Sequence, residues 1–168
     1  QVPVSSANLE LSEITLLDGK GRRKTPRTHL LPLTPAAKKD VETLVKRAKD
    51  MKSTMLFASR GKTLTAESLS AYVHDMSVAM IANKLSPAPF QFRDLRRTAE
   101  TMMASLNVTK DVRAQLQSHG LGGVQDRHYD RFHYMPQKTS ALLSWQAHLD
   151  CLADRQASAS AATECTLA

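Results

Sequence analysis

The chain has 168 residues, 42% of them hydrophobic and 5% aromatic, and its formal net charge at pH 7 is +7. This length and apolar content suffice for one domain with a buried core, and no run of roughly 18 apolar residues predicts a membrane-spanning helix. Two cysteines, Cys151 and Cys165, stand without metal-ligand spacing, which argues against a disulfide framework or a zinc site. The basic excess predicts a polyanionic partner, either nucleic acid or an anionic membrane surface. The first residues lack the basic and apolar blocks of a signal peptide, so we expect a cytoplasmic protein.

A β-hairpin is predicted near the start of the chain. Residues 9–17 (LELSEITLL) mix apolar, polar and β-branched positions, which favours a strand. A glycine-rich basic turn follows, and the apolar run at residues 29–33 (HLLPL) supplies the second strand, in which Pro32 indicates a sheet edge or a strand end. Five basic side chains are predicted on or beside the turn: Lys20, Arg22, Arg23, Lys24 and Arg27.

Two helices are predicted after the hairpin. Thr34 supplies a hydroxyl cap and Pro35 a first-turn proline for a helix over residues 35–50. Thr65 opens a second, longer helix that reaches about residue 84. Apolar residues recur at helical spacing along this second helix, so we expect its methionine-rich stripe to pack against the rest of the domain.

Three further helices and a tail are predicted in the second half of the chain. The helices are expected over residues 92–106, over residues 109–118 and from Met135 onward. Small polar residues dominate positions 157–168, so we expect a flexible or exchanged C-terminal tail there. The predicted fold is thus mainly α with a small antiparallel β-hairpin, an α+β domain over residues 1–156.

Three arginines, Arg93, Arg96 and Arg97, stand together at the start of a predicted helix. Arg93 and Arg96 are three positions apart and therefore share a helix face. A guanidinium offers two parallel donors to a phosphate and keeps its charge, which suits a site where phosphate charge builds up. The alternative is a solvated basic face whose arginines pair locally with Asp94 or Glu100.

His119 and Tyr129 are the next candidates for chemistry. His119 stands at a predicted helix end before a glycine-rich turn, and Tyr129 follows ten positions later within the charged stretch DRHYDR. A tyrosine hydroxyl can act as a nucleophile and forms a phosphodiester when it attacks a phosphate. The alternative is an interfacial tyrosine with a hydrogen-bonded hydroxyl.

Two segments of the sequence together carry a family resemblance. RDLRRTAETMMASLNVTKDVRAQLQSHGLGGVQDRHYDRF contains an R-D-L-R-R-T helix start, a short helix that ends in S-H-G, and then H-Y-D-R. DGKGRRKTPRTHLLPLTPAA contributes a basic hairpin that leads into a capped helix. In this order the elements resemble the catalytic domain of tyrosine recombinases of the phage-integrase type. The resemblance extends from about residue 14 to residue 149.

The resemblance implies a role for each matching residue. Tyr129 matches the nucleophile, Arg96 the second catalytic arginine, and His119 the histidine of the second conserved pair. Lys20 matches the catalytic lysine of the hairpin because it stands in a Gly-Lys-Gly turn, and Lys24 is the alternative for that role.

Two departures from the family pattern concern arginine. Arg93 occupies a position that the family most often fills with histidine or lysine. Arginine keeps a phosphate donor there but cannot serve as an acid or base. The family also uses a first arginine about twenty or more residues ahead of the hairpin lysine, and counting back from Lys20 leads beyond Gln1. We therefore expect a catalytic domain without its N-terminal part, inactive by itself, rather than a degenerate protein.

The function implied by the resemblance is site-specific DNA recombination or integration. DNA would be cut and rejoined through a 3′-phosphotyrosine intermediate, without a metal, nucleotide or other cofactor. The expected partners are double-stranded DNA attachment sites and further copies of the protein, four on the DNA, at the nucleoid of a bacterial or phage-infected cell. The DNA-binding candidates are Arg22, Arg23, Lys24, Arg27, Arg97 and Arg127.

Two other classes of function compete with this prediction. One is a non-catalytic DNA-binding module that uses the same basic faces, with Tyr129 packing or contacting phosphate. The other is a basic adaptor without a DNA role. The ordered set of motifs argues against the adaptor more strongly than against the binding module.

Overall fold

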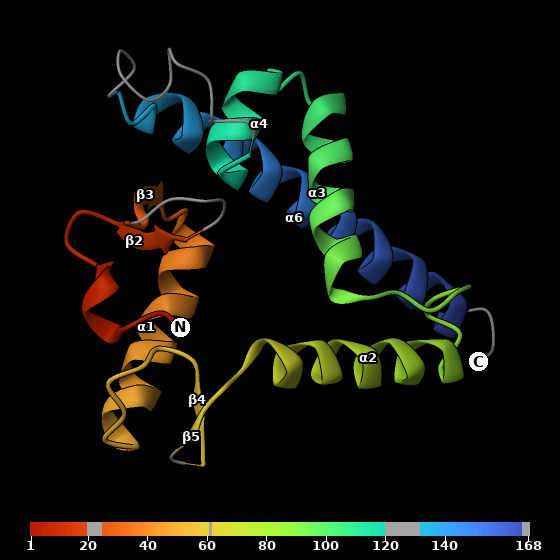
Figure 1. Cartoon of the computed structure of the whole chain (residues 1–168). Helices are drawn as coiled ribbons and strands as arrows, with labels where there is room; N and C mark the ends of the chain where they lie inside the picture. The colour runs from red at the N-terminus through yellow and green to blue at the C-terminus, as the bar shows by residue number, and fades with distance from the viewer. Residues whose placement is uncertain (20–24, 61, 120–131, 166–168) are drawn as a thin grey trace.

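The computed structural model describes residues 1–19, 25–60, 62–119 and 132–165 of the chain (Figure 1). Within these residues the fold is mainly helical, with five α-helices and two small antiparallel sheets, so the predicted α+β class is confirmed. Six residues with predicted roles lie outside the described residues: Lys20, Arg22, Arg23, Lys24, Arg127 and Tyr129.

The larger sheet contains the predicted hairpin. After a 3-10 turn η1 (Val4–Ser6), the short strand β1 (Ala7–Asn8) pairs with β2 (Glu13–Asp18), which pairs with β3 (Arg27–Pro32), all antiparallel. The register runs from Glu13 opposite Pro32 to Asp18 opposite Arg27. Pro32 ends an edge strand, as its missing N–H predicts. Strand β1 was not predicted, because two residues are too short a run to show a strand pattern.

The first helix and a small second sheet follow the hairpin. Helix α1 (Pro35–Asp50) begins where the sequence predicts, since the Thr34 hydroxyl accepts a hydrogen bond from the backbone N–H of Ala37 at 3.4 Å. It buries Val41 and Ala48. Strands β4 (Ala58–Ser59) and β5 (Lys62–Thr63) then pair as a minimal antiparallel sheet.

Helices α2 (Ala66–Ala82) and α3 (Phe92–Ser105) lie within a few residues of their predicted bounds. The Thr65 hydroxyl caps α2 by accepting from the Ser68 N–H at 3.2 Å. At the start of α3 the Gln91 N–H donates to Oδ2 of Asp94 at 2.9 Å, which satisfies one of the amides left over at a helix N-terminus.

Helices α4 (Lys110–Gln117) and α6 (Met135–Cys165) complete the fold. Helix α4 ends at Ser118, which adopts a left-handed conformation with φ 53°. The backbone of α6 continues to Cys165 and so includes residues 157–165, which belong to the segment predicted as a flexible or exchanged tail. The physical reason is composition: alanine has the highest intrinsic helix propensity, and it fills four of the six positions in ASASAA.

The core lies where α3, α4 and α6 meet the sheet. Met103, Leu116 and Ala141, one from each helix, are buried together. Each fully buried side chain of the size of Met or Leu contributes about 1.5–3 kcal/mol. Apolar residues packed around this cluster come from β3, the α3–α4 connection, α4 and α6: Leu31, Val108, Val112, Leu142 and Trp145. This cluster fixes α3 relative to α4.

Helix α2 differs from its predicted packing. It crosses the lower part of the molecule as an arm that contacts α3 (Figure 1). Val73 and Ser77 are its buried residues, whereas Tyr72 and Met76 of the expected packing stripe are exposed. The Ser77 hydroxyl accepts from the Phe90 N–H at 2.8 Å and so holds the α2–α3 connection. Across the described residues, each helix is too short or too polar to span a lipid bilayer.

Candidate functional site

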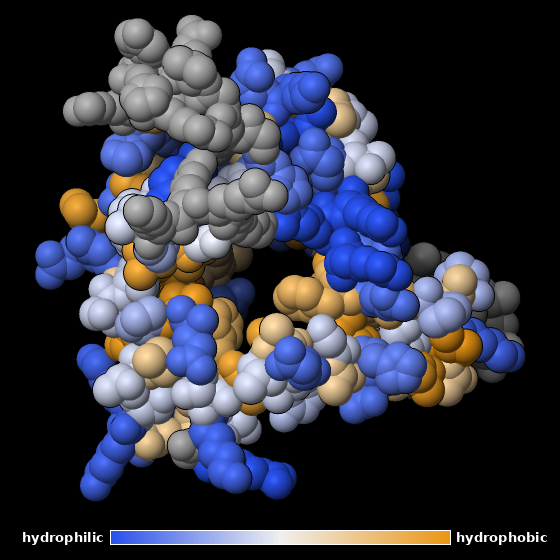
Figure 2. Space-filling model, in the orientation of Figure 1, coloured by the Kyte–Doolittle hydropathy of each residue, from blue (hydrophilic) through white to orange (hydrophobic). Residues whose placement is uncertain are grey.

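A basic cavity of about 330 Å³ lies between α3 and α4. Figure 2 shows that hydrophilic side chains gather over these two helices. Two predicted catalytic residues, Arg96 and His119, line this one cavity although they are far apart in the sequence. The other lining residues are Arg97, Glu100, Lys110, Arg113, Ala114 and Gln117.

The guanidinium of Arg96 is held by one residue of the facing helix. Its Nε donates to Oε1 of Gln117 at 2.8 Å, and its Nη2 donates to the backbone oxygen of Gln117 at 2.5 Å. Both bonds join α3 to the last turn of α4, whose final carbonyls lack partners within their own helix. The Arg96 side chain is therefore oriented even though the residue is exposed.

Glu100 on α3 also joins the two helices, because its carboxylate accepts hydrogen bonds from two residues of α4. Its Oε1 accepts from Nε of Arg113 at 2.8 Å, and its Oε2 accepts from Nε2 of Gln117 at 2.7 Å. Arg113 also donates through Nη1 to the backbone oxygen of Val108. A continuous chain of hydrogen bonds thus runs along the cavity wall, from Arg113 through Glu100 and Gln117 to Arg96.

The other two arginines of the R-D-L-R-R-T motif behave differently from Arg96. Arg97 pairs with Asp94 at 3.3 Å, with 72% of its side chain exposed. This is the local pairing that the alternative interpretation of the motif predicts, and such an exposed pair contributes about 0–1 kcal/mol. Arg93 is exposed on the first turn of α3 and is not among the residues that line the cavity.

His119 directly follows the left-handed Ser118, at the point where α4 ends. Its backbone N–H donates to the carbonyl of Ala114 at 3.0 Å, which closes the helix and places the residue at the rim of the cavity. A C-terminal helix residue in this conformation is usually glycine, so Ser118 is an uncommon choice. The Ser118 hydroxyl makes hydrogen bonds to the hairpin that a glycine could not make.

Ser118 joins the end of α4 to the base of the hairpin. Nη2 of Arg27 donates to the Ser118 hydroxyl at 2.8 Å, and that hydroxyl donates to Oδ2 of Asp18. Beside this bridge, Nε2 of His29 is hydrogen-bonded to the carbonyl of Gln115 at 2.9 Å. Arg27, predicted as a DNA contact, is half-buried and has this structural role in the described fold.

Comparisons of the chain with protein-family models, with curated proteins and with solved structures found no match. The resemblance to tyrosine recombinases stays a prediction from sequence motifs.

Several residues of the cavity were not predicted as site residues. Lys110, Arg113 and Gln117 are spaced three and four positions apart, so they share one face of α4. That spacing was visible in the sequence, but nothing local indicated that this face meets α3. The sequence predicts Glu100 only as a partner for the arginines of its own helix.

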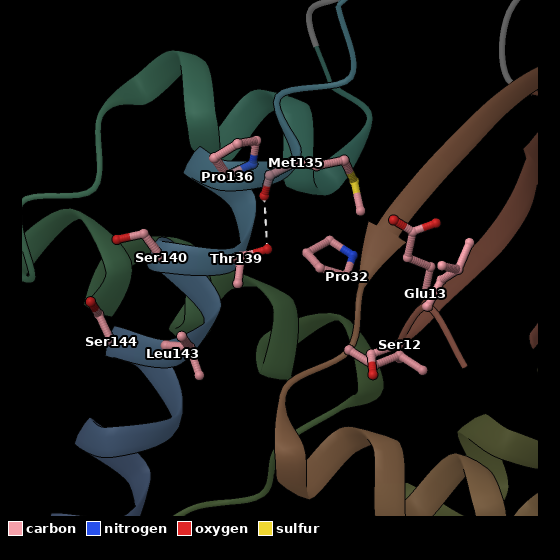
Figure 3. A pocket seen from close by; sticks show the side chains of 11 residues that line it. Ser12, Glu13, Pro32, Met135, Pro136, Thr139, Ser140, Leu143 and Ser144 are labelled. Carbon is pink, nitrogen blue, oxygen red and sulfur yellow. Dashed lines mark hydrogen bonds between the residues drawn. The ribbon is translucent and has the colours of Figure 1, made fainter. Parts of the chain in front are cut away.

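A larger cavity of about 670 Å³ lies between the sheet and α6 (Figure 3). Pro32 and Ser12 line it on the sheet side, and Met135 and Thr139 on the α6 side. Glu13 is the single charged residue among those that line it. With a carboxylate and no basic side chain, this lining is unsuited to a phosphate, so the smaller cavity is the better candidate site.

Two buried basic groups lie beside the hairpin, His29 on β3 itself and Lys138 on the facing helix α6. His29 is 7% exposed and Lys138 is 2% exposed, and Nζ of Lys138 donates to the carbonyl of Leu30 at 2.9 Å. Burial lowers the pKa of His29, and the positive charges of Lys138 and Arg27 lower it further, against the opposing effects of the Gln115 carbonyl and Asp18. Burial and then the charge of Arg27 lower the pKa of Lys138. Neutral His29 is thus the form that the fold favours.

We expect the stability of the chain to fall on mild acidification because of His29. The folded-state pKa lies below the ordinary value of about 6.5, so the contribution is complete above that value and is lost as the pH falls through the folded pKa. Urea unfolding at pH 7.5 and at pH 5 measures this loss. His29→Gln should weaken the pH dependence, whereas His74→Gln, at an exposed position on α2, should leave it unchanged. Equal pH dependence in all three proteins would contradict the assignment.

Proposed function

We propose that this protein cuts and rejoins DNA as a site-specific recombinase, with Tyr129 as the nucleophile. The observation that supports the proposal most directly is the shared cavity of Arg96 and His119. The family resemblance assigns both residues to the scissile phosphate, and the separate helices α3 and α4 bring them to one place. We also propose that the fold is that of a tyrosine-recombinase catalytic core.

The charges around the cavity favour a phosphate ligand. Arg96, Arg97, Lys110 and Arg113 supply four cations against the single carboxylate of Glu100. Glu100 is paired with Arg113, and Arg97 is paired with Asp94, so within the described part of the chain Arg96 and Lys110 are the two cations without a carboxylate partner that can attract a polyanion. A net charge of +7 for the whole chain agrees with DNA as that polyanion.

In the proposed reaction, the Tyr129 hydroxyl gives up its proton to solvent as its oxygen bonds to phosphorus, while the bond from phosphorus to the 5′-oxygen breaks. Arg96 and His119 stabilise the charge on the pentacoordinate phosphate, and Lys20 gives its proton to the leaving 5′-oxygen. The product is a 3′-phosphotyrosine with a free 5′-hydroxyl. A 5′-hydroxyl of a second strand reverses these steps, so rejoining needs no nucleotide. Preorganised donors of this kind commonly lower a barrier by about 3–4 kcal/mol each.

Two parts of the proposal rest on the resemblance alone. Tyr129 and Lys20 lie outside the described residues, and so do the hairpin-tip candidates for DNA binding. The assembly of four copies on two attachment sites is likewise carried over from the family. The competing function is a DNA-binding module that uses the same cations without covalent chemistry.

Covalent trapping on DNA distinguishes the two functions. The substrate is a duplex that spans an end of the genetic element encoding the protein, nicked so that the 5′-hydroxyl product diffuses away. We expect the protein, expressed from its complete reading frame, to give a slowly migrating adduct on a denaturing gel. Tyr129→Phe should abolish the adduct and leave DNA affinity nearly unchanged, because only the nucleophilic oxygen is lost.

Each contrary result has a definite meaning. An adduct that persists in Tyr129→Phe identifies another nucleophile, with Tyr134 the next candidate. DNA binding without an adduct, in the wild-type protein and on its own attachment site, favours the binding module. Absence of salt-sensitive DNA binding at low ionic strength contradicts both functions.

A further inference from the structure

The hydrogen bonds of Arg96 use one particular edge of its guanidinium. A guanidinium has two edges with paired donors, one formed by Nε and Nη2 and the other by Nη1 and Nη2. Both bonds to Gln117 leave from the first edge. Within the described residues, the second edge makes no recorded hydrogen bond, so it is the edge that can receive a phosphate.

Gln117 can hold Arg96 only if its own amide group is correctly turned. Its Oε1 must face the Nε of Arg96, and its Nε2 must then face an acceptor. Oε2 of Glu100 is that acceptor, at 2.7 Å. A carboxylate accepts hydrogen bonds but does not donate them, so Glu100 permits this orientation of the amide and disfavours the reverse one.

Glu100 is in turn fixed by Arg113. The Glu100–Arg113 contact at 2.8 Å joins α3 to α4, and the side chain of Arg113 is only 16% exposed. An unpaired carboxylate in a phosphate cavity would repel the ligand, and pairing with Arg113 offsets that repulsion. Glu100 is therefore placed to orient a neighbour at little electrostatic cost.

We infer that Glu100 and Gln117 are positioning residues that hold the Nη1–Nη2 edge of Arg96 toward the cavity. Neither residue needs to touch the substrate, because both act through Arg96. The inference about orientation stands on the hydrogen bonds alone. Its consequence for catalysis rests on the proposed function.

Two substitutions test the inference, each breaking the chain at a different place. Gln117→Leu removes the side-chain acceptor for the Arg96 Nε–H and the donor to Glu100, and it keeps the backbone acceptor for Nη2. Glu100→Gln keeps the shape of the side chain but replaces one carboxylate oxygen with an NH₂ group. Either Arg113 or Gln117, which both donate to Glu100, then faces an N–H in place of an acceptor. Glu42→Gln, on the exposed surface of α1, is the matched control for the loss of one negative charge.

The first measurement is hydrogen exchange of the Arg96 Nε–H by nuclear magnetic resonance, with the resonance assigned through Arg96→Lys. A hydrogen bond to a charged group is worth about 1.5–3 kcal/mol, so each of the two variants should speed this exchange about tenfold or more. Glu42→Gln should leave it unchanged. Exchange in Gln117→Leu and Glu100→Gln that equals wild type, in proteins with unchanged thermal unfolding, would overturn the inference.

The second measurement compares DNA affinity with the rate of adduct formation. Glu100→Gln removes a negative charge from the cavity, so DNA affinity should hold or rise. The adduct rate should nevertheless fall about tenfold or more, because the Nη1–Nη2 edge of Arg96 is no longer held toward the cavity. A purely electrostatic role for Glu100 predicts instead that affinity and rate rise together, and that result would overturn its role as a positioning residue. Altered exchange with no adduct in any protein would support the positioning and reject the proposed recombinase function.

Discussion

Replacing Arg96 with alanine is expected to lower adduct formation about 100- to 1000-fold. Removing one donor from a preorganised charge-stabilising site typically has an effect of this size. Arg96 is the arginine of its motif that is both oriented by the facing helix and part of the cavity wall. The measurement is the initial rate of adduct formation on a nicked duplex at saturating DNA, which removes the effect of weaker binding.

Two other arginine variants make this result interpretable. Arg47→Ala removes one positive charge from the exposed face of α1 and should leave the rate near wild type. Arg93→Ala removes a residue that the resemblance places at the phosphate but that does not line the cavity. A loss for Arg93→Ala as large as that for Arg96→Ala would show that the phosphate lies closer to the start of α3. A rate for Arg96→Ala within a few fold of wild type would remove Arg96 from the proposed chemistry.

Helix starts were predictable because capping is local chemistry. Thr34, Thr65 and Thr109 each accept a hydrogen bond from the backbone N–H three residues later. The sequence predicts helix starts at Thr34 and Thr65, and it places Thr109 at the first position of its helix. Strands β1, β4 and β5 were not predicted, because two residues are too few to show the alternating pattern of a strand. The methionine-rich stripe of α2 shows a second limit. Its period predicts a helix face, but only the tertiary structure decides whether that face is covered.

The candidate site was predictable only in part, for a related reason. Arg96 and His119 were identified from motifs, and the structure brings both to one cavity. The partners that orient Arg96 come from α4, and no pattern within α3 could indicate them. Glu100 illustrates the point, since it pairs with Arg113 across the helix interface rather than with an arginine of its own helix.

Met103→Ala is expected to destabilise the fold by about 2–5 kcal/mol. Met103 is 6% exposed and packs with Leu116 and Ala141, so the substitution removes buried methylenes and leaves a cavity where three helices meet. Such a loss is a large part of the total of about 5–15 kcal/mol that is typical of a domain. Chemical denaturation of both proteins at pH 7.5 gives the difference directly.

Met76→Ala is the matched control, because Met76 is 48% exposed on α2 and its loss should change stability by no more than about 0.5 kcal/mol. Equal effects of the two substitutions would contradict the position of the core. The core also sets the site, since Met103 and Leu116 lie on the same helices as Arg96 and Gln117. We therefore expect Met103→Ala, under conditions where it remains folded, to speed exchange of the Arg96 Nε–H, because a looser α3–α4 contact weakens the hold of Gln117 on the guanidinium.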